Sequence, residues 1–223
     1  MKFTEGYWEK SERANASHAM QAFIVEEIPN GMQIVAPFHI ITDRSGALDV
    51  GTITIEFTAI RKDVISVRSW HFEGYQRKEP RFELNKDMQD VDVEITDEKA
   101  IMTAGRMQVC VDRKDFKIEY KADRKVLTTC GFRNIGYMQY DRSNSTKFPE
   151  SNYMYSDYTP YMNTELSLAP GECVYGMGER FTSFVKNGQV VDCWNEDGGT
   201  ASQISYKNIP FYMTNKNYGI LVD

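Results

Sequence analysis

Three motifs between residues 175 and 213 decide the fold of this chain: YGMGERF (175–181), WNEDGGT (194–200) and KNIPFYM (207–213). Glycines, aromatic residues and charged residues crowd together in them, whereas the rest of the chain alternates apolar and polar residues as β-strands do. Gly176 and Gly178 flank a single residue, and this spacing permits a close backbone approach or a positive φ. The motifs therefore predict exposed loops, and loops held by a rigid sheet often carry binding groups.

Outside these motifs the sequence reads as short strands separated by polar turns. Residues 52–59 alternate cleanly, which predicts a half-buried antiparallel strand with its isoleucines and Phe57 facing inward. Asn30-Gly31 lies between two apolar runs and predicts a hairpin, because both residues tolerate a positive φ. Strand patterns recur about every 8 to 12 residues, which is typical of a sandwich or a barrel. The sequence therefore predicts an all-β fold, an antiparallel β-sandwich that forms a single domain over residues 1–223.

Three segments are less regular. Residues 9–20 predict at most one helical turn, because their apolar spacing fits a helix poorly. Residues 141–161 are polar and rich in Tyr, and they predict a long excursion or a region of short strands. Residues 211–222 predict two strands joined by a turn at residues 215–217, and Phe211 is expected in the core.

Composition excludes several classes of protein. The net charge of −6 leaves no basic surface for nucleic acid or for an anionic membrane. The N-terminal segment is charged, and no apolar run approaches the roughly 20 residues of a membrane span, so we expect a cytoplasmic protein without a signal peptide. The four cysteines are scattered, and they are expected as free thiols in a reducing compartment. The three histidines are isolated, and we expect no metal site and no cofactor.

The three motifs and the opening MKFTEGYW (1–8) resemble, in their order and spacing, the N-terminal β-sandwich domain of the family 31 glycoside hydrolases, in particular the bacterial α-xylosidase branch. The resemblance covers the whole chain. It implies a galactose mutarotase-like sandwich that is truncated at its C-terminal end. In this family a catalytic (β/α)8 barrel would begin after Asp223, so the resemblance implies that the barrel is absent from this chain. The loop around residues 186–206 would then belong to the substrate pocket.

The resemblance assigns a role to two residues of that loop. It implies that Asp197 hydrogen-bonds sugar hydroxyls and that Trp194 lies near the sugar, where an aromatic ring can stack on a sugar face. From the residues alone, Asp197 could equally belong to an Asx-turn before Gly198.

Other residues are expected to have structural or oligomeric roles. The structural supports of the loop are Gly176, Gly178, Glu179 and Arg180. A Glu-Arg pair beside a glycine turn can form an ion pair that pins the loop. Trp8 and Asp49 also fit the α-xylosidase pattern, in which the N-terminal domain takes part in oligomer contacts. The alternative is a packed Trp and an ordinary exposed Asp.

The resemblance implies a non-catalytic domain of a retaining α-glycosidase, of the α-xylosidase or α-glucosidase type, with both catalytic carboxylates in the barrel and no activity in this chain alone. Its partners would be that barrel, an α-linked oligosaccharide and further copies of the full-length protein in a homo-oligomer. A second hypothesis is a stand-alone carbohydrate-binding module, which the aromatic content of 13% would allow. Sugar epimerisation is a third, but it usually needs a histidine, and the stretch 175–213 contains none.

Overall fold

The computed structural model describes residues 4–5, 9–10, 12–74, 86–141, 158–197 and 204–222. These residues form strands and loops, with one short 3-10 helix, η1 (Ser45–Ala47), among them. The chain divides into two compact units: a larger unit, Phe3–Ser167, and a smaller unit, Leu168–Asp223 with Met1–Lys2. That the whole chain acts as one domain stays a prediction.

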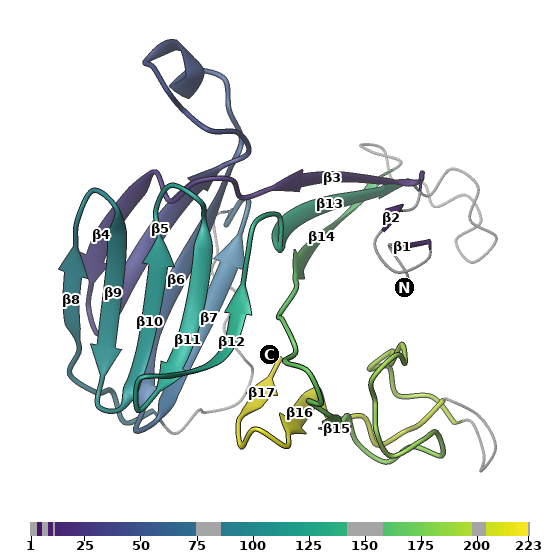
Figure 1. Cartoon of the computed structure of the whole chain (residues 1–223). Coiled ribbons are helices and arrows are strands. Elements are labelled where there is room, and N and C mark those ends of the chain that lie inside the picture. The colour runs from purple at the N-terminus through teal and green to yellow at the C-terminus, as the bar shows by residue number, and fades with distance from the viewer. Residues whose placement is uncertain are drawn as a thin grey trace. The chain divides into compact units, whose positions relative to one another are not determined.

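The larger unit contains an antiparallel β-sandwich (Figure 1). One sheet has the strand order β4-β5-β6-β7, and the other has the order β12-β11-β10-β9-β8. The strands are β4 (Ile24–Ile28), β5 (Gly31–Pro37), β6 (Thr52–Arg61), β7 (Val64–Trp70), β8 (Asp92–Ile95), β9 (Lys99–Ala104), β10 (Met107–Asp112), β11 (Lys117–Ala122) and β12 (Lys125–Cys130). Buried side chains from both sheets form one core cluster, so the predicted antiparallel β-sandwich is confirmed.

The alternation of residues 52–59 builds this core as predicted. Ile53, Ile55 and Phe57 of β6 are fully buried, while the polar residues between them are only partly buried. Val109 and Ile118 of the other sheet are buried to the same extent. Because burying a side chain of this size contributes about 1.5–3 kcal/mol, apolar contact between the sheets is the main source of stability in the larger unit.

The hairpin predicted at Asn30-Gly31 is present between β4 and β5. Asn30 has the positive φ, at 59°. Gly31 is required for a different reason, because a Cβ at this position would overlap the carbonyl oxygen of Phe57 in the neighbouring strand. The glycine therefore permits the close approach of β5 and β6.

A third sheet, of order β14-β13-β3, belongs to the same unit. It consists of β3 (Ala14–His18), β13 (Ile135–Asp141) and β14 (Tyr158–Thr164), and the short strands β1 (Thr4–Glu5) and β2 (Glu9–Lys10) pair with each other before it. The helical turn predicted within residues 9–20 is wrong, because β3 pairs with β13 and such pairing overrides weak local propensity. The excursion predicted at residues 141–161 ends in β14, and residues 142–157 lie outside the described residues.

The smaller unit contains a three-stranded antiparallel sheet of order β15-β16-β17. Its strands are β15 (Val174–Gly176), β16 (Phe211–Thr214) and β17 (Gly219–Leu221). The two strands predicted within residues 211–222 are therefore confirmed. All three sequence motifs lie wholly or mostly in the long connection between β15 and β16.

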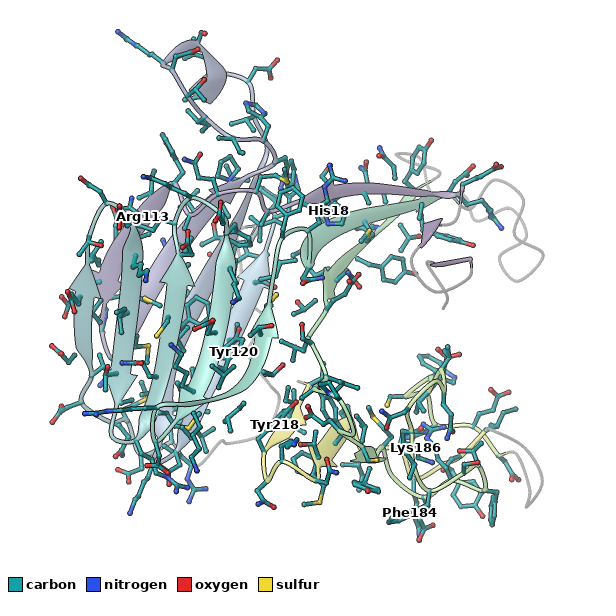
Figure 2. All side chains as sticks on the ribbon, in the orientation of Figure 1. His18, Arg113, Tyr120, Phe184, Lys186 and Tyr218 are labelled. Carbon is teal, nitrogen blue, oxygen red and sulfur yellow. The ribbon has the colours of Figure 1, made fainter. Side chains whose placement is uncertain are left out.

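Arg113 fastens the two layers of the sandwich to each other (Figure 2). Its guanidinium donates hydrogen bonds to the carbonyl oxygens of Ala22 (3.3 Å), Phe23 (3.1 Å) and Thr96 (2.6 Å). The N–H of Ala22 donates in return to the carbonyl oxygen of Arg113 (3.1 Å). Ala22 and Phe23 lead into β4 of one sheet, whereas Thr96 follows β8 of the other. A single side chain thus bonds to backbone from both layers.

We expect Arg113→Met to lower the free energy of unfolding by about 1–3 kcal/mol, because it leaves three carbonyl oxygens without a charged donor. Urea unfolding followed by circular dichroism measures this change. The matched control is Lys114→Met, which removes an exposed charge from the same turn and should leave the midpoint nearly unchanged. Equal midpoints for the two variants would show that Arg113 does not hold the layers together.

Candidate functional site

The backbone leaves β15 through three consecutive residues with positive φ. The angles are 120° at Gly176, 71° at Met177 and 84° at Gly178. A Cβ on Gly178 would overlap the carbonyl oxygen of Lys207, and a Cβ on Gly176 would lie 2.6 Å from the carbonyl oxygen of Phe211. Both glycines are therefore required on two counts, backbone conformation and space.

Two backbone hydrogen bonds fix this close approach. The N–H of Met177 donates to the carbonyl oxygen of Phe211 (2.8 Å), and the N–H of Glu179 donates to that of Lys207 (3.0 Å). The segment that begins the first motif thus lies directly against the segment that contains the third. These two hydrogen bonds close a loop whose ends are Glu179 and Lys207.

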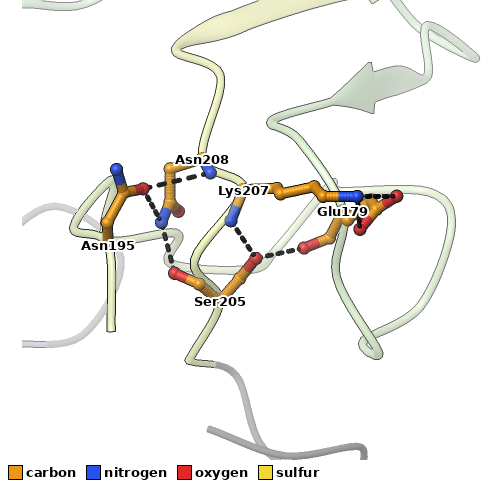
Figure 3. Close-up of polar contacts among 5 residues, drawn as sticks. All are labelled: Glu179, Asn195, Ser205, Lys207 and Asn208. Atoms are coloured by element: carbon orange, nitrogen blue, oxygen red, sulfur yellow. Dashed lines mark hydrogen bonds and ion pairs between the residues drawn. The ribbon is translucent and has the colours of Figure 1, made fainter. Parts of the chain in front are cut away.

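Asn208 joins the two ends of the loop (Figure 3). Its side-chain amide donates to the carbonyl oxygen of Trp194 (2.8 Å), to Oδ1 of Asn195 (2.9 Å) and to the carbonyl oxygen of Ser205 (2.6 Å). Its Oδ1 accepts a hydrogen bond from the guanidinium of Arg180. We call residues 194–205 the motif loop, and Asn208 contacts both of its described ends.

Ser205 and Glu179 continue this network (Figure 3). The hydroxyl of Ser205 donates to the carbonyl oxygen of Glu179 (2.6 Å) and accepts from the N–H of Lys207 (3.1 Å). The carboxylate of Glu179 lies 3.2 Å from the ammonium of Lys207. Both side chains of this ion pair are largely exposed, so it contributes little to stability.

Arg180 acts as a structural bridge within the same network. Its guanidinium donates to the carbonyl oxygens of Met177 (3.0 Å) and Asp192 (2.9 Å) as well as to Asn208. The structure therefore brings together all four expected supports of the loop, Gly176, Gly178, Glu179 and Arg180. The sequence led us to expect an ion pair between Glu179 and Arg180, and the structure shows one between Glu179 and Lys207.

The motif loop presents its distinctive side chains to solvent. Asp197 is exposed, and Trp194 is 74% exposed, as expected for a loop residue. Tyr206, directly after the loop, is 64% exposed. The glycines and Thr200 that follow Asp197 lie outside the described residues. The exposed carboxylate thus sits on a loop whose base is fixed, and this arrangement suits recognition of a polar ligand.

The expectation that Phe211 lies in the core was wrong. Phe211 is 40% exposed, because it lies on the open face of the short sheet β15-β16-β17. Sequence reasoning also missed Asn208, which sits inside the third motif and reads as an ordinary turn residue. Pro210, two residues later, directly precedes β16, and a polar amide just before a strand was the available signal.

Two histidines outside the motifs bond to backbone. Nε2 of His39 lies 3.0 Å from the carbonyl oxygen of Gly46, and Nδ1 of His71 lies 2.7 Å from that of Thr52, so both rings serve as local backbone partners. Asp49 is exposed, Trp8 lies outside the described residues, and their oligomeric role stays a prediction.

Three general findings concern the described residues only. No group of three or more His, Cys, Asp or Glu side chains is placed to hold a metal ion. The four cysteines are free thiols. In the part of the chain that the structure covers, no helix has the length and apolar character needed to cross a membrane.

We expect Gly178→Ala to loosen the base of the motif loop, because the added methyl group overlaps backbone. Gly188→Ala is the matched control, since Gly188 also has a positive φ (76°) but has no atom within 4 Å of the added Cβ. Both variants bear the left-handed penalty of about 1–2 kcal/mol, and only Gly178→Ala adds the overlap. Hydrogen exchange at the amides of Met177 and Glu179 should therefore accelerate much more in Gly178→Ala. Equal acceleration would mean that conformation alone explains Gly178.

We expect Asn208→Ala to release the motif loop, because it removes the bonds to both loop ends. The amide of Glu196, which donates to the carbonyl oxygen of Ser205 (3.0 Å), should exchange about tenfold or more faster. Lys207→Met removes only the exposed ion pair and should leave that amide unchanged. An unchanged Glu196 amide in Asn208→Ala would show that the loop is held without the asparagine.

We compared this chain with known protein families, proteins and structures. A family model described as the glycosyl hydrolase 31 N-terminal galactose mutarotase-like domain matches residues 54–223. Alpha-xylosidase XylQ of Lactiplantibacillus pentosus is 35% identical over the whole chain, which spans 27% of that protein. An alpha-xylosidase of Emericella nidulans is also 35% identical over the whole chain, which spans 29% of it.

Solved structures show the same fold. The GH31 dextranase FjDex31A of Flavobacterium johnsoniae, complexed with glucose, aligns with a TM-score of 0.66 at 15% identity, over 92% of this chain and 22% of that one. The cycloalternan-forming enzyme of Listeria monocytogenes aligns with a TM-score of 0.66 at 14% identity, over 92% of this chain and 17% of that one. The sheet topology, the three motifs and the family match agree, and this chain belongs to glycoside hydrolase family 31, as an N-terminal galactose mutarotase-like domain.

Proposed function

We propose that this chain is the non-catalytic N-terminal domain of a retaining α-glycosidase that acts on α-xylosides, and that it lends the motif loop to the sugar-binding pocket of the catalytic domain. The observation that carries the proposal is the combination of a rigid loop base and an exposed loop surface. Asn208 and Arg180 hold the base, while Asp197 and Trp194 are exposed. The 35% identity to two alpha-xylosidases supports the choice of substrate class.

The chemistry of these side chains suits a sugar. An ionised carboxylate such as Asp197 accepts hydrogen bonds from neighbouring hydroxyls, and charge-assisted bonds of this kind are stronger than neutral ones. An aromatic ring such as Trp194 can cover the apolar face of a pyranose. The loop therefore supplies binding and orientation, not bond cleavage.

Cleavage itself is assigned to the catalytic domain. Retaining glycosidases use two carboxyl groups about 5–5.5 Å apart, one as nucleophile and one as general acid/base. In our proposal both belong to the catalytic barrel, which is the partner of this chain within one polypeptide. The α-linked oligosaccharide is the shared ligand. Assembly into a homo-oligomer and a cytoplasmic location stay predictions.

A stand-alone carbohydrate-binding module is the second candidate. The exposed rings of Trp194 and Tyr206 favour it, because an exposed aromatic ring offers an apolar face on which a sugar ring can stack. Titration calorimetry of the chain with xylose and isoprimeverose distinguishes the two functions. Saturable one-site binding by the chain alone supports the module, and absence of heat supports a loop that needs its catalytic domain.

The direct test is Asp197→Asn in the polypeptide of the whole reading frame. Loss of a charge-assisted hydrogen bond to the substrate should raise KM for an aryl α-xyloside by about tenfold or more. Glu196→Gln is the matched control, because Glu196 is the adjacent exposed carboxylate, and its KM should be unchanged. Identical kinetics for the two variants would contradict a role for Asp197 in the pocket.

A further inference from the structure

Glu172 is the one buried carboxylate in the described part of the chain. It is 4% exposed and precedes β15 in the smaller unit, where the other buried residues among those described are Lys186 (8%) and Thr214 (3%). The proposed function does not use this carboxylate. Because a buried charge costs free energy unless hydrogen bonds or other charges stabilise it, its contacts show what it holds together.

The backbone of Glu172 holds part of the connection between β15 and β16. Its N–H donates to the carbonyl oxygen of Ala169 (3.0 Å), and its carbonyl oxygen accepts from the side-chain amide of Asn187 (2.9 Å). Oδ1 of Asn187 accepts from the N–H of Val174 (2.8 Å), and the N–H of Lys186 donates to the carbonyl oxygen of Val174 (2.8 Å). Residues 186–187 of the connection are therefore held against the start of β15.

The residues on either side of Glu172 hold the hairpin between β16 and β17. The N–H of Cys173 donates to Oδ1 of Asn215 (3.0 Å), and the N–H of Asn215 donates to the carbonyl oxygen of Cys173 (3.3 Å). The side-chain amide of Asn215 donates to the carbonyl oxygen of Gly171 (3.1 Å). Residues 171–173 thus contact the turn that follows β16.

The carboxylate of Glu172 joins the same parts of the unit. Its Oε2 accepts from the N–H of Ala169 (2.7 Å). Its Oε1 is buried and has no hydrogen bond of good geometry, but the hydroxyls of Tyr218 and Thr214 lie close enough to stabilise the negative charge. Tyr218 lies on the hairpin between β16 and β17 (Figure 2), and its carbonyl oxygen accepts from the N–H of Thr214 (2.9 Å). The charge therefore ties the turn before β15 to this hairpin.

The surroundings of Glu172 favour its charged form. Burial by itself raises the pKa of a carboxyl group, and it acts in that direction here. Hydrogen bonds from Tyr218, Ala169 and Thr214, together with the charge of Lys216, outweigh burial and hold the pKa of Glu172 below its usual value. The ionised form is therefore the one that fits the folded unit.

Glu172 is also the group in this cluster that changes charge in acid. Among the described residues, the titratable and charged groups that face it are Tyr212 of β16 and, from the turn after β16, Lys216 and Tyr218. Burial raises the pKa of Tyr212, and the charge of Glu172 raises it further. Tyrosine and lysine side chains keep their protons at acid pH, so a fall in pH acts on this cluster through Glu172.

We propose that Glu172 is a positioning residue for the motif loop, and that the smaller unit opens around β15 and β16 when this carboxylate takes up a proton. The role in catalysis rests on the proposed function, whereas the opening does not. β15 and β16 lead directly into the crossing of residues 176–179 with residues 207–211, which holds the base of the motif loop. A change at Glu172 thus reaches the loop through the two strands that carry it.

The sign of the pH dependence follows from the direction of the pKa shift. A carboxyl group whose pKa is lower in the folded chain than in the unfolded chain contributes its full stabilisation above the unfolded value, which is about 4.3 for Glu. That contribution is lost as the pH falls through the folded value. The smaller unit should therefore be closed near neutral pH and open in acid.

Hydrogen exchange of this chain at different pH values tests the opening. The protection of the amides of Val174 and Lys186, corrected for the intrinsic exchange rate at each pH, should fall about tenfold or more between about pH 6 and about pH 3. Its midpoint should coincide with the titration of the Glu172 carboxyl carbon followed by NMR, while amides of β6 and β10 keep their protection. Constant protection, or a loss shared equally by β6 and β10, would overturn the proposal.

Two variants assign this loss to Glu172. Glu172→Gln cannot titrate, so at about pH 7 the two amides should already exchange as they do in acid and should show no further step. Tyr218→Phe removes a hydroxyl that favours the charge, so the midpoint should rise by about half a pH unit or more. The matched control is Glu196→Gln, which alters an exposed carboxylate of the same unit and should leave the midpoint unchanged. A step that remains in Glu172→Gln, or an unchanged midpoint in Tyr218→Phe, would refute the assignment.

Kinetics of the polypeptide of the whole reading frame test the positioning role. Glu172→Gln should raise KM for an aryl α-xyloside about threefold or more and change kcat less than about twofold, because the loop binds the sugar and does not cleave it. If Asp197→Asn raises KM and Glu172→Gln does not, the pocket role of the loop stands and the positioning role fails. If the exchange step depends on Glu172 while neither variant alters KM, the opening stands and the pocket role fails.

Discussion

The smaller unit depends on a backbone approach so close that side chains are excluded from it. Where residues 176–179 pass residues 207–211, the carbonyl oxygens of Lys207 and Phe211 occupy the space that a Cβ at Gly178 or Gly176 would need. Hydrogen bonds from Met177 and Glu179 then close the contact. Because this crossing defines both ends of the connection between β15 and β16, it determines where Asn208 and Arg180 can act and so where the motif loop begins and ends.

The two units are stabilised by different forces. The larger unit buries alternating apolar residues between two sheets, and Arg113 adds bonds from one layer to the other. Among the described residues of the smaller unit, the buried ones are Glu172, Lys186 and Thr214, and the apolar ones are partly buried or exposed. Burial of the Lys186 ammonium lowers its pKa, and the nearby charge of Arg180 adds to this effect. A charge is tolerated there because its donors are used, whereas a hydrophobic core would exclude it.

Local patterns predicted the sandwich, and they failed where distant pairing decides. Residues 52–59 alternate so regularly that their inward face could be named in advance. Strand β9 was not predicted, because its buried Ala100 and Ala104 are too small to give a strong period. Strand β3 was not predicted, because its conformation depends on pairing with β13, more than one hundred residues away in sequence.

Phe211 was wrongly assigned to the core, because an aromatic residue in a strand was assumed to belong to the core of its own unit. The glycines of the site could be predicted from their spacing, but the bonding of Asn208 depends on a tertiary contact that no short motif encodes.

The polar interior of the smaller unit has a thermal consequence. The heat capacity change of unfolding comes mainly from apolar surface that becomes hydrated, and polar surface changes it in the opposite direction. Among the described residues of this unit the buried ones are Glu172, Lys186 and Thr214, so its opening carries a smaller heat capacity change per residue than unfolding of the sandwich. Its local stability should vary almost linearly with temperature and continue to rise on cooling, while the sandwich passes through a maximum. On cooling, the stability of the smaller unit and that of the sandwich would then change in opposite directions below the sandwich's maximum.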